Sequence, residues 1–356
     1  MSFTEIIGQE QVLSLFKSAL QNERLAHAYI FAGQEGIGKM MFARELAKKI
    51  FCQSGKIDDA CDVCSICKRI MVDNFADLFF LFPEKNHRVI KLEQLKHLQE
   101  ILYVKPIEAK HKIVIIEDAD KMNEEASNCL LKTLEEPPLY AIILLIVTSL
   151  ESVSETIKSR CQIVRFSPLP VDVIRNILTE RFQLDKQQAT QFAFISGGSL
   201  ARAAMLMDAN ALEKKHWLAK KLFEINCADN LTFSQEVLDE WNIQDFDILE
   251  EKRTHVKELF FLFLMYYRDM LICKAGGTDF PLYYDDWKDA LIKKGKSLTE
   301  NTLFKILDII KTSLKYLDYN ANINLLIENM ITEILYIISD PKALKDERPL
   351  FRIDSL

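Results

Sequence analysis

The sequence has no long apolar run and no excess of basic residues. The apolar run 259–267 spans nine residues, well short of the ~20 that a membrane-spanning helix needs. The net charge is −7, with 45 lysines and arginines against 52 aspartates and glutamates, which excludes a protein that binds nucleic acid mainly through its overall charge. The first residues also lack the basic and apolar segments of a signal peptide. We therefore expect a cytoplasmic protein with no membrane partner.

Glycine is also scarce, with only ten residues in 356. Three of them, Gly33, Gly36 and Gly38, lie within six positions, and Gly197 and Gly198 are adjacent. Such clusters indicate where the backbone adopts angles that are closed to other residues. The remaining composition, 49% hydrophobic and 27% charged, is that of an ordinary globular protein with two or three domains.

The N-terminal part of the chain alternates strand and helix patterns. Buried strands are predicted at 27–32, 112–117, 141–148 and 162–166, and helices at 41–51 and 123–136. Continuous apolar strands separated by helices predict a parallel sheet with helices on both faces. After the proline-containing segment 167–170 nearly all of the pattern is helical. We predict an α/β domain over 1–167, a small helical domain over 168–208 and an all-helical domain over 209–356.

The glycine cluster forms a phosphate-binding motif. Gly33, Gly36, Gly38 and Lys39 fit the pattern G-x-x-x-x-G-K between a predicted strand and a predicted helix, where backbone N–H groups, the lysine and the helix N-terminus favour phosphate. A glycine-rich turn without a ligand is the alternative. Met40 occupies the position where Ser or Thr normally ligates Mg²⁺, and a thioether is a poor ligand for that ion. The motif predicts ATP or ADP binding with doubtful Mg²⁺ ligation and impaired hydrolysis.

Two carboxylates follow the second predicted strand. Glu117 and Asp118 end an apolar segment that looks like a Walker B motif, whose carboxylates hold the metal and orient the attacking water. An active member of this class usually has Asp followed by Glu, so the order is reversed here. Since Asp118 is one methylene shorter than the usual base, this departure also predicts weak catalysis.

Four of the eight cysteines lie close together just after the phosphate-binding segment. Cys52, Cys61, Cys64 and Cys67 have the spacing C-x₈-C-x₂-C-x₂-C, and four thiolates complete a closed tetrahedral zinc shell. We predict a structural zinc module over 52–67. Unrelated thiols and an iron–sulfur cluster are the alternatives, and nothing else in the sequence indicates redox chemistry.

Three further side chains are candidates for contact with a nucleotide. Thr148 ends a predicted strand and either hydrogen-bonds a phosphate or caps the strand. Arg160, within Ser-Arg-Cys, and Arg202, after the glycine pair, are either solvated surface residues or phosphate ligands.

Taken together, these segments resemble the clamp-loader branch of the AAA+ family. The resemblance covers the first 208 residues, and the helical remainder matches only in being helical. It is carried by the following segments: 6–9 (Ile-Ile-Gly-Gln), 27–31 (His-Ala-Tyr-Ile-Phe), the P-loop, the four cysteines, 115–120 (Ile-Ile-Glu-Asp-Ala-Asp), 130–138 (Leu-Leu-Lys-Thr-Leu-Glu-Glu-Pro-Pro), 159–161 (Ser-Arg-Cys) and 197–202.

The resemblance implies a role for each candidate residue. Arg160 would be an arginine finger that reaches into the ATP site of a neighbouring subunit, Thr148 would be sensor 1, and Arg202 would be sensor 2. The four cysteines would be the zinc ligands. The fold would be an AAA+ P-loop domain with a zinc-binding insertion, followed by a helical lid and a helical collar that packs with sister subunits.

The function implied is that of a subunit of the bacterial DNA polymerase III clamp loader, which uses ATP to place the sliding clamp on primed DNA. Its partners would be the gamma/tau and delta subunits and, through the complex, the beta clamp and primer–template DNA. Met40 favours a stationary ring member that does not hydrolyse ATP. The alternatives are an active gamma/tau-type ATPase and a zinc-stabilised scaffold with an empty nucleotide site.

Overall fold

The computed structural model describes residues 6–54, 59–84, 89–207, 209–225, 230–243, 249–277, 280–317 and 321–339. The chain forms two compact units, Met1–Ala204 and Met205–Leu356. The boundary falls inside helix α9 (Leu200–Leu206). The finer division of the first unit into an α/β domain and a lid stays a prediction.

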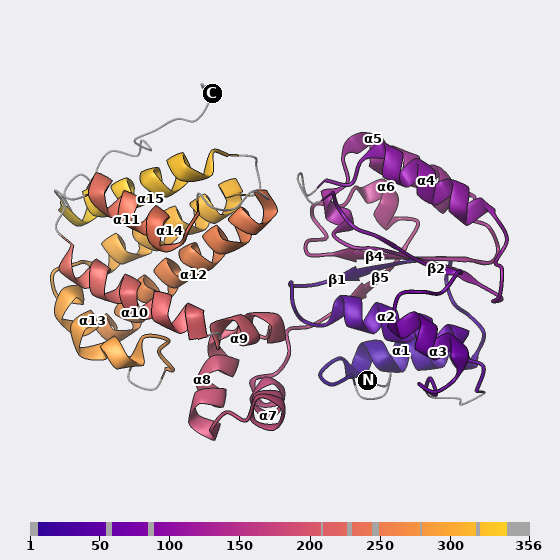
Figure 1. Cartoon of the computed structure of the whole chain (residues 1–356), viewed down its shortest axis with the longest axis horizontal. Coiled ribbons are helices and arrows are strands. Elements are labelled where there is room, and N and C mark those ends of the chain that lie inside the picture. The colour runs from indigo at the N-terminus through magenta and orange to yellow at the C-terminus, as the bar shows by residue number, and fades with distance from the viewer. Residues whose placement is uncertain are drawn as a thin grey trace. The chain divides into compact units, whose positions relative to one another are not determined.

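The first unit is built on a five-stranded parallel sheet (Figure 1). Its strands are β1 (Ala28–Ala32), β2 (Leu78–Leu81), β3 (Lys112–Ile116), β4 (Ala141–Val147) and β5 (Gln162–Arg165). They lie in the order β2-β3-β4-β1-β5, so β1 pairs with both β4 and β5. The predicted parallel sheet is confirmed. Strand β2 was not predicted from the sequence.

Helices cover both faces of the sheet, as Figure 1 shows. The helices of this layer structure are α1 (Glu10–Gln21), α2 (Lys39–Phe51) and α3 (Ser65–Met71) on one face, and α4 (Leu92–Tyr103), α5 (Glu124–Glu135) and α6 (Glu155–Lys158) on the other. Alternate residues of each strand point to opposite faces. In β1, Tyr29 and Phe31 pack with α1 and α2, whereas Ile30 packs on the side of α4 and α5. The three central strands, β3, β4 and β1, are buried at every residue, which agrees with their almost continuous apolar sequence.

The parallel sheet brings three functional segments to one edge. The P-loop follows β1, Glu117 follows β3 and Thr148 follows β4, and these strands are adjacent. Because parallel strands end at the same edge, residues far apart in the sequence meet there, at the position where ligands bind in open α/β sheets.

Three helices complete the first unit: α7 (Val171–Phe182), α8 (Lys186–Ile195) and α9. Helix α7 begins after Pro170, and the Asp185 side chain caps α8 by accepting from the backbone N–H groups of its first turn. The backbone N–H of Leu200 donates to the carbonyl of Gly36 at 3.1 Å. The start of α9 is therefore bonded directly to the P-loop.

The second unit is helical in all of its described segments. Its α-helices are α10 (Ala209–Glu224), α11 (Asn230–Glu240), α12 (Leu249–Lys274), α13 (Lys288–Gly295), α14 (Glu300–Leu317) and α15 (Ile323–Ser339). Its core includes buried tyrosines, Tyr266, Tyr283 and Tyr284, whose rings pack edge to face. Among the residues that the structure describes, no helix is long and apolar enough to cross a membrane.

Candidate functional site

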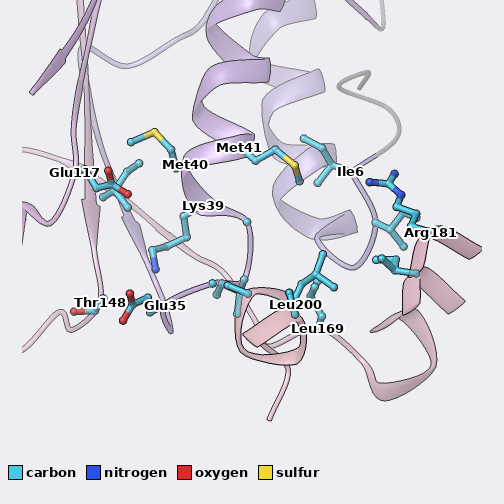
Figure 2. Close-up of a pocket in the computed structure, with 18 of the residues that line it drawn as sticks. Ile6, Glu35, Lys39, Met40, Met41, Glu117, Thr148, Leu169, Arg181 and Leu200 are labelled. Carbon is cyan, nitrogen blue, oxygen red and sulfur yellow. The ribbon is translucent and has the colours of Figure 1, made fainter. Parts of the chain in front are cut away.

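A cavity of 550 Å³ opens between the P-loop, the ends of β3 and β4, and helices α7 and α9 (Figure 2). Lys39, Glu117 and Thr148 line one end, and the predicted candidates Gly36, Gly38, Met40 and Asp118 also line the cavity. Figure 2 shows Lys39 directed toward the end where Thr148 and Glu35 lie, and Arg181 at the opposite end beside Ile6. Sequence motifs scattered over more than a hundred residues thus converge on one cavity.

The P-loop backbone has the form of an anion cradle. Gly36 has φ +77° and Gly38 has φ +95°, a left-handed region that favours glycine. A Cβ atom at Gly36 would lie 2.3 Å from Ser199 Oγ, and one at Gly33 would lie 2.6 Å from the Phe166 carbonyl oxygen. Among the described residues, no side chain caps the N-terminus of α2, so the N–H groups of its first turn are available to a phosphate.

Lys39 is buried, with 6% of its surface exposed. Its Nζ donates to the carbonyl oxygens of Gly33 and Gln34, the latter at 2.8 Å. Burial lowers the pKa of Lys39, while the nearby carboxylates of Asp118 and Glu35 act in the opposite direction. The ammonium group is therefore held inside the cradle. A bound phosphate would replace the two backbone carbonyls as the hydrogen-bond partner of Lys39.

Two of the acidic residues near Lys39, Asp118 and Asp120, are paired with side chains of the chain itself. Asp118, in the left-handed region at φ +50°, pairs with Lys121 at 2.6 Å. Burial, and to a smaller extent Asp118, raises the pKa of Glu117. Asp120 Oδ2 accepts the hydroxyl of Thr148 at 2.6 Å. Thr148 therefore lines the cavity while its hydroxyl donates a hydrogen bond to the Asp120 carboxylate.

Met40 and Met41 occupy the first turn of α2 and both line the cavity. In Figure 2, Met41 extends toward Ile6. Mg²⁺ takes oxygen ligands in near-octahedral geometry, and position 40 offers a thioether in place of the usual hydroxyl. The residues of the cavity therefore fit a nucleotide but not the usual anchoring of its Mg²⁺.

Helix α7 contributes an arginine that was not predicted from the sequence. Arg181 of α7 lines the cavity, together with Ile177 one helical turn before it. Arg202 is not among the described residues that line the cavity, although its backbone N–H donates to Ser199 Oγ at 3.2 Å. The i, i+4 spacing of Ile177 and Arg181 was the available signal, because it puts both residues on one helix face.

Arg160 lies outside this cavity, just after α6. Its guanidinium donates to the carbonyl of Thr156 at 3.0 Å and to Ser159 Oγ at 3.2 Å, and it pairs with Glu135 at 2.7 Å. About a third of the side chain, 34%, is exposed. Arg160 is therefore held at the surface of the first unit and not beside Lys39.

The four predicted zinc ligands come together. The Sγ atoms of Cys52, Cys61, Cys64 and Cys67 all lie within 4.8 Å of one another. Tetrahedral Zn–S bonds of ~2.3 Å place sulfurs about 3.8 Å apart, so a small contraction would close the shell. Residues 55–58 of the predicted module lie outside the described part of the chain.

Backbone N–H groups favour the thiolate form of Cys61, whereas burial raises the pKa of Cys67. The N–H groups of Cys61, Cys64 and Cys67 point at Sγ of Cys52, Cys61 and Cys64 at 3.2, 3.3 and 3.4 Å. The N–H groups of Cys64 and Val63 lower the pKa of Cys61 to about 6. Because metal ligation requires the thiolate, this donor set fits zinc, which would act structurally and leave no coordination position for water.

A buried lysine joins the P-loop helix α2 to the cysteine loop, the segment 59–64 that carries Cys61 and Cys64. Lys48 of α2 is 2% exposed and pairs with Glu45 and, at 2.7 Å, with Asp62 of the cysteine loop. Burial opposes the charge, but the hydrogen bonds to Asp62 and Glu45 raise the pKa of Lys48. The metal module is therefore attached to the helix whose first turn lines the cavity.

Comparison with known proteins agrees with this geometry. A family model described as "DNA polymerase III, delta subunit" matches residues 8–170. The DNA polymerase III subunit delta' of Bacillus subtilis is 30% identical over 91% of this chain and 95% of its own length. The tau subunit of Escherichia coli is 34% identical over 58% of this chain, and the match spans 32% of that protein.

A Thermotoga maritima protein described as DNA polymerase III gamma subunit-related is 20% identical, with a TM-score of 0.45, and the match covers 92% of this chain and 99% of that one. From its motifs, its parallel sheet and its likeness to the Bacillus relative over nearly the whole length of both, the chain belongs to the clamp-loader family of DNA polymerase III delta-prime subunits.

Proposed function

We propose that this chain is a stationary member of the DNA polymerase III clamp loader that supplies Arg160 to the ATP site of a neighbouring subunit. The chain itself would bind a nucleotide but would not turn it over. The position of Arg160 carries the proposal, because its guanidinium is partly exposed at the surface and away from the chain's own cavity.

Arg160 has the chemistry of such a finger. Guanidinium is always charged and presents its donors in a rigid fork that matches phosphate oxygens. Placed on the γ-phosphate of a neighbour, it would stabilise the charge that develops during transfer, a contribution of ~10³–10⁵ in rate in GTPase examples.

The chain's own cavity supports the non-hydrolysing half of the proposal. Met40 and Met41 supply no hydroxyl for Mg²⁺, and Asp118 is paired with Lys121. A nucleotide bound here would meet the P-loop amides and Lys39, but the metal would lack its usual anchor. The cavity would therefore hold ATP or ADP as a structural ligand.

The partners follow from the relatives. Delta-prime, gamma and tau are named as DNA polymerase III subunits, and we propose that this chain assembles with gamma/tau and delta subunits through its helical second unit. Through the complex it would act on the beta clamp and on primer–template DNA.

Steady-state ATP hydrolysis tests this proposal. The chain alone, its gamma/tau and delta partners, and the reconstituted complex are compared with clamp and primed DNA present. We expect no turnover by the chain alone and DNA-stimulated turnover by the complex. Arg160→Ala should lower the DNA-stimulated turnover of the complex at least ~10³-fold at each ATP site that Arg160 contacts.

Arg175→Ala is the matched control, since Arg175 is also partly exposed and paired within its own helix, to Asp172 at 2.6 Å. It should leave turnover unchanged. Robust turnover by the isolated chain would instead establish a gamma/tau-type ATPase. Unchanged turnover with Arg160→Ala would remove the finger role.

A further inference from the structure

Arg160 is held by residues from two different elements. Thr156 and Ser159 belong to α6 and the residue that caps it, so they move with the arginine. Glu135 is the last residue of α5, and it is the contact that ties the guanidinium to a separate helix. Without it, the side chain would be anchored only to its own short helix.

We propose that Glu135 is a positioning residue that orients the Arg160 guanidinium for a phosphate on a neighbouring subunit. This inference rests on the function proposed above. Glu135 does not touch the nucleotide; it acts through Arg160.

The contacts of the guanidinium indicate that Glu135 orients Arg160 and does not block its contact with a phosphate. Arginine has five N–H donors. Nη1 donates to the Thr156 carbonyl and to Ser159 Oγ, and Nη2 forms an ion pair with Glu135 Oε1 at 2.7 Å. Among the described residues, none accepts a hydrogen bond from Nε. These three contacts involve at most three of the five donors, so at least two N–H groups remain for a phosphate while Arg160 is paired with Glu135.

The position of Glu135 is well fixed. Helix α5 ends at Glu135 and is followed by Glu136 and two prolines, which restrict the backbone that follows it. Helix α5 packs directly on α6, and Leu134 lies in the same buried cluster as Ile157. The carboxylate and the arginine are therefore carried by elements that pack together, and a carboxylate fixed in this way can define the direction of the guanidinium plane.

The pair contributes little to folding. Glu135 is 51% exposed and Arg160 is 34% exposed, and solvent-exposed ion pairs contribute little to the stability of a protein. A variant that lacks the carboxylate is therefore expected to fold, and a change in its activity reports on orientation.

The test uses the reconstituted complex with the Glu135→Gln chain. Glutamine keeps the length of the side chain but loses the charge-assisted bond. We expect the kcat for DNA-stimulated hydrolysis at the neighbouring site to fall about tenfold, because a small misplacement of a catalytic group has effects of that order. The KM for ATP should stay within about twofold, since Glu135 does not touch the nucleotide.

Glu136→Gln is the matched control: the same substitution, one residue later, at a carboxylate other than the one that pairs with Arg160. It should leave kcat unchanged. In an Arg160→Ala background, Glu135→Gln should have no further effect, because the two residues act as one unit. A purely structural role would lower activity in both backgrounds.

Three results would overturn the proposal. An unchanged kcat would mean that Arg160 needs no orienting partner. A raised kcat would mean that the carboxylate competes with the phosphate. An equal loss in the Arg160→Ala background would place the effect elsewhere. If Arg160→Ala does not lower kcat, the proposed function is wrong and this inference is wrong with it. If Arg160→Ala lowers kcat but Glu135→Gln does not, only the role of Glu135 is wrong.

Discussion

The two compact units bury charge for different purposes. In the first unit, Lys39 faces a cavity and Lys48 joins the P-loop helix to the cysteine loop. In the second unit, Asp269 is fully buried, but it accepts from the backbone N–H of Tyr284 at 2.8 Å and from Arg268 at 2.6 Å. A buried charge therefore indicates a functional site only where a cavity or an open ligand set accompanies it.

The unfolding of the two units can be followed separately, because all three tryptophans, Trp217, Trp241 and Trp287, lie in the second unit. Tryptophan fluorescence therefore follows the second unit alone, whereas far-UV circular dichroism follows both. Each of the following perturbations is directed at one unit, and the other serves as its internal reference.

The largest effect is expected from loss of the metal. Cys64→Ser should lower the zinc content from one ion per chain to none, because three thiolates leave the tetrahedral shell open. Zinc contributes ~10 kcal/mol to folding in zinc-finger peptides, so the unfolding midpoint of the first unit should fall by ~10 °C or more. Metal analysis and circular dichroism measure the two quantities.

The tryptophan transition of the second unit should not move in that variant. Cys129→Ser, a cysteine outside the cluster, is the control and should retain its zinc. If Cys64→Ser still binds one zinc ion, or the wild-type chain binds none, the assignment of the cluster is wrong.

A pH-dependent effect is expected in the second unit. Burial raises the pKa of Asp269 from 3.8 to about 6, in spite of the hydrogen bond from Tyr284 and the charge of Arg268. Between pH ~4 and ~6 the folded state holds a proton that the unfolded state has released, so this contribution to stability is lost as the pH rises through that window, by at most about 3 kcal/mol. Denaturant unfolding followed by tryptophan fluorescence measures it.

Asp269→Asn should flatten that dependence, because the amide oxygen still accepts from Tyr284 and no proton is exchanged. Asp289→Asn, at a position in the first turn of α13, should keep the wild-type slope. A slope that survives in the Asp269→Asn chain would show that another group titrates.

The smallest effect is expected at the P-loop of the first unit. The four cysteines of this unit form a complete set of metal ligands, whereas the P-loop lacks the hydroxyl that usually ligates Mg²⁺. Met40→Thr supplies the missing hydroxyl, so the affinity for ATP in the presence of Mg²⁺ should rise by about tenfold relative to ATP with chelator. Calorimetric titration of the two ligand forms measures this ratio.

Met41→Thr, the neighbouring methionine of the same turn, is the control and should not change the ratio. Equal affinities for the two ligand forms in the Met40→Thr chain would show that a hydroxyl at position 40 does not restore Mg²⁺ binding.

The local motifs were predictable because their chemistry is written in short stretches of sequence. The C-x₂-C-x₂-C spacing brings three thiolates within reach of one ion, and Cys52 lies close to them. Likewise, a strand, a glycine-rich loop and a lysine at the start of a helix identify the P-loop without further information. Strand β2 was not predicted, although the apolar run 78–82 precedes Pro83, because periodicity alone does not distinguish a short buried strand from other short apolar segments.

The contacts of the individual candidates were set by tertiary structure. Thr148 lies in the predicted cavity, but its hydroxyl is donated to Asp120, a pairing between the segments after β3 and β4 that no local pattern contains. Arg181 lines the cavity, whereas Arg202, the arginine selected from the sequence, does not. The fold of the first unit, and not the glycine pair beside Arg202, determines which arginine faces the cavity.

The sequence by itself determined the parallel α/β core, the P-loop, the cysteine ligand set and the absence of a hydroxyl at Met40, because periodicity, spacing and side-chain chemistry are local properties. Tertiary structure decided the rest. Only the meeting of strand ends at one edge of the sheet places Lys39, Glu117 and Thr148 around one cavity, and only the packing of α5 and α6 brings Glu135 to Arg160. These contacts join residues distant in sequence, and their geometry depends on how whole elements pack.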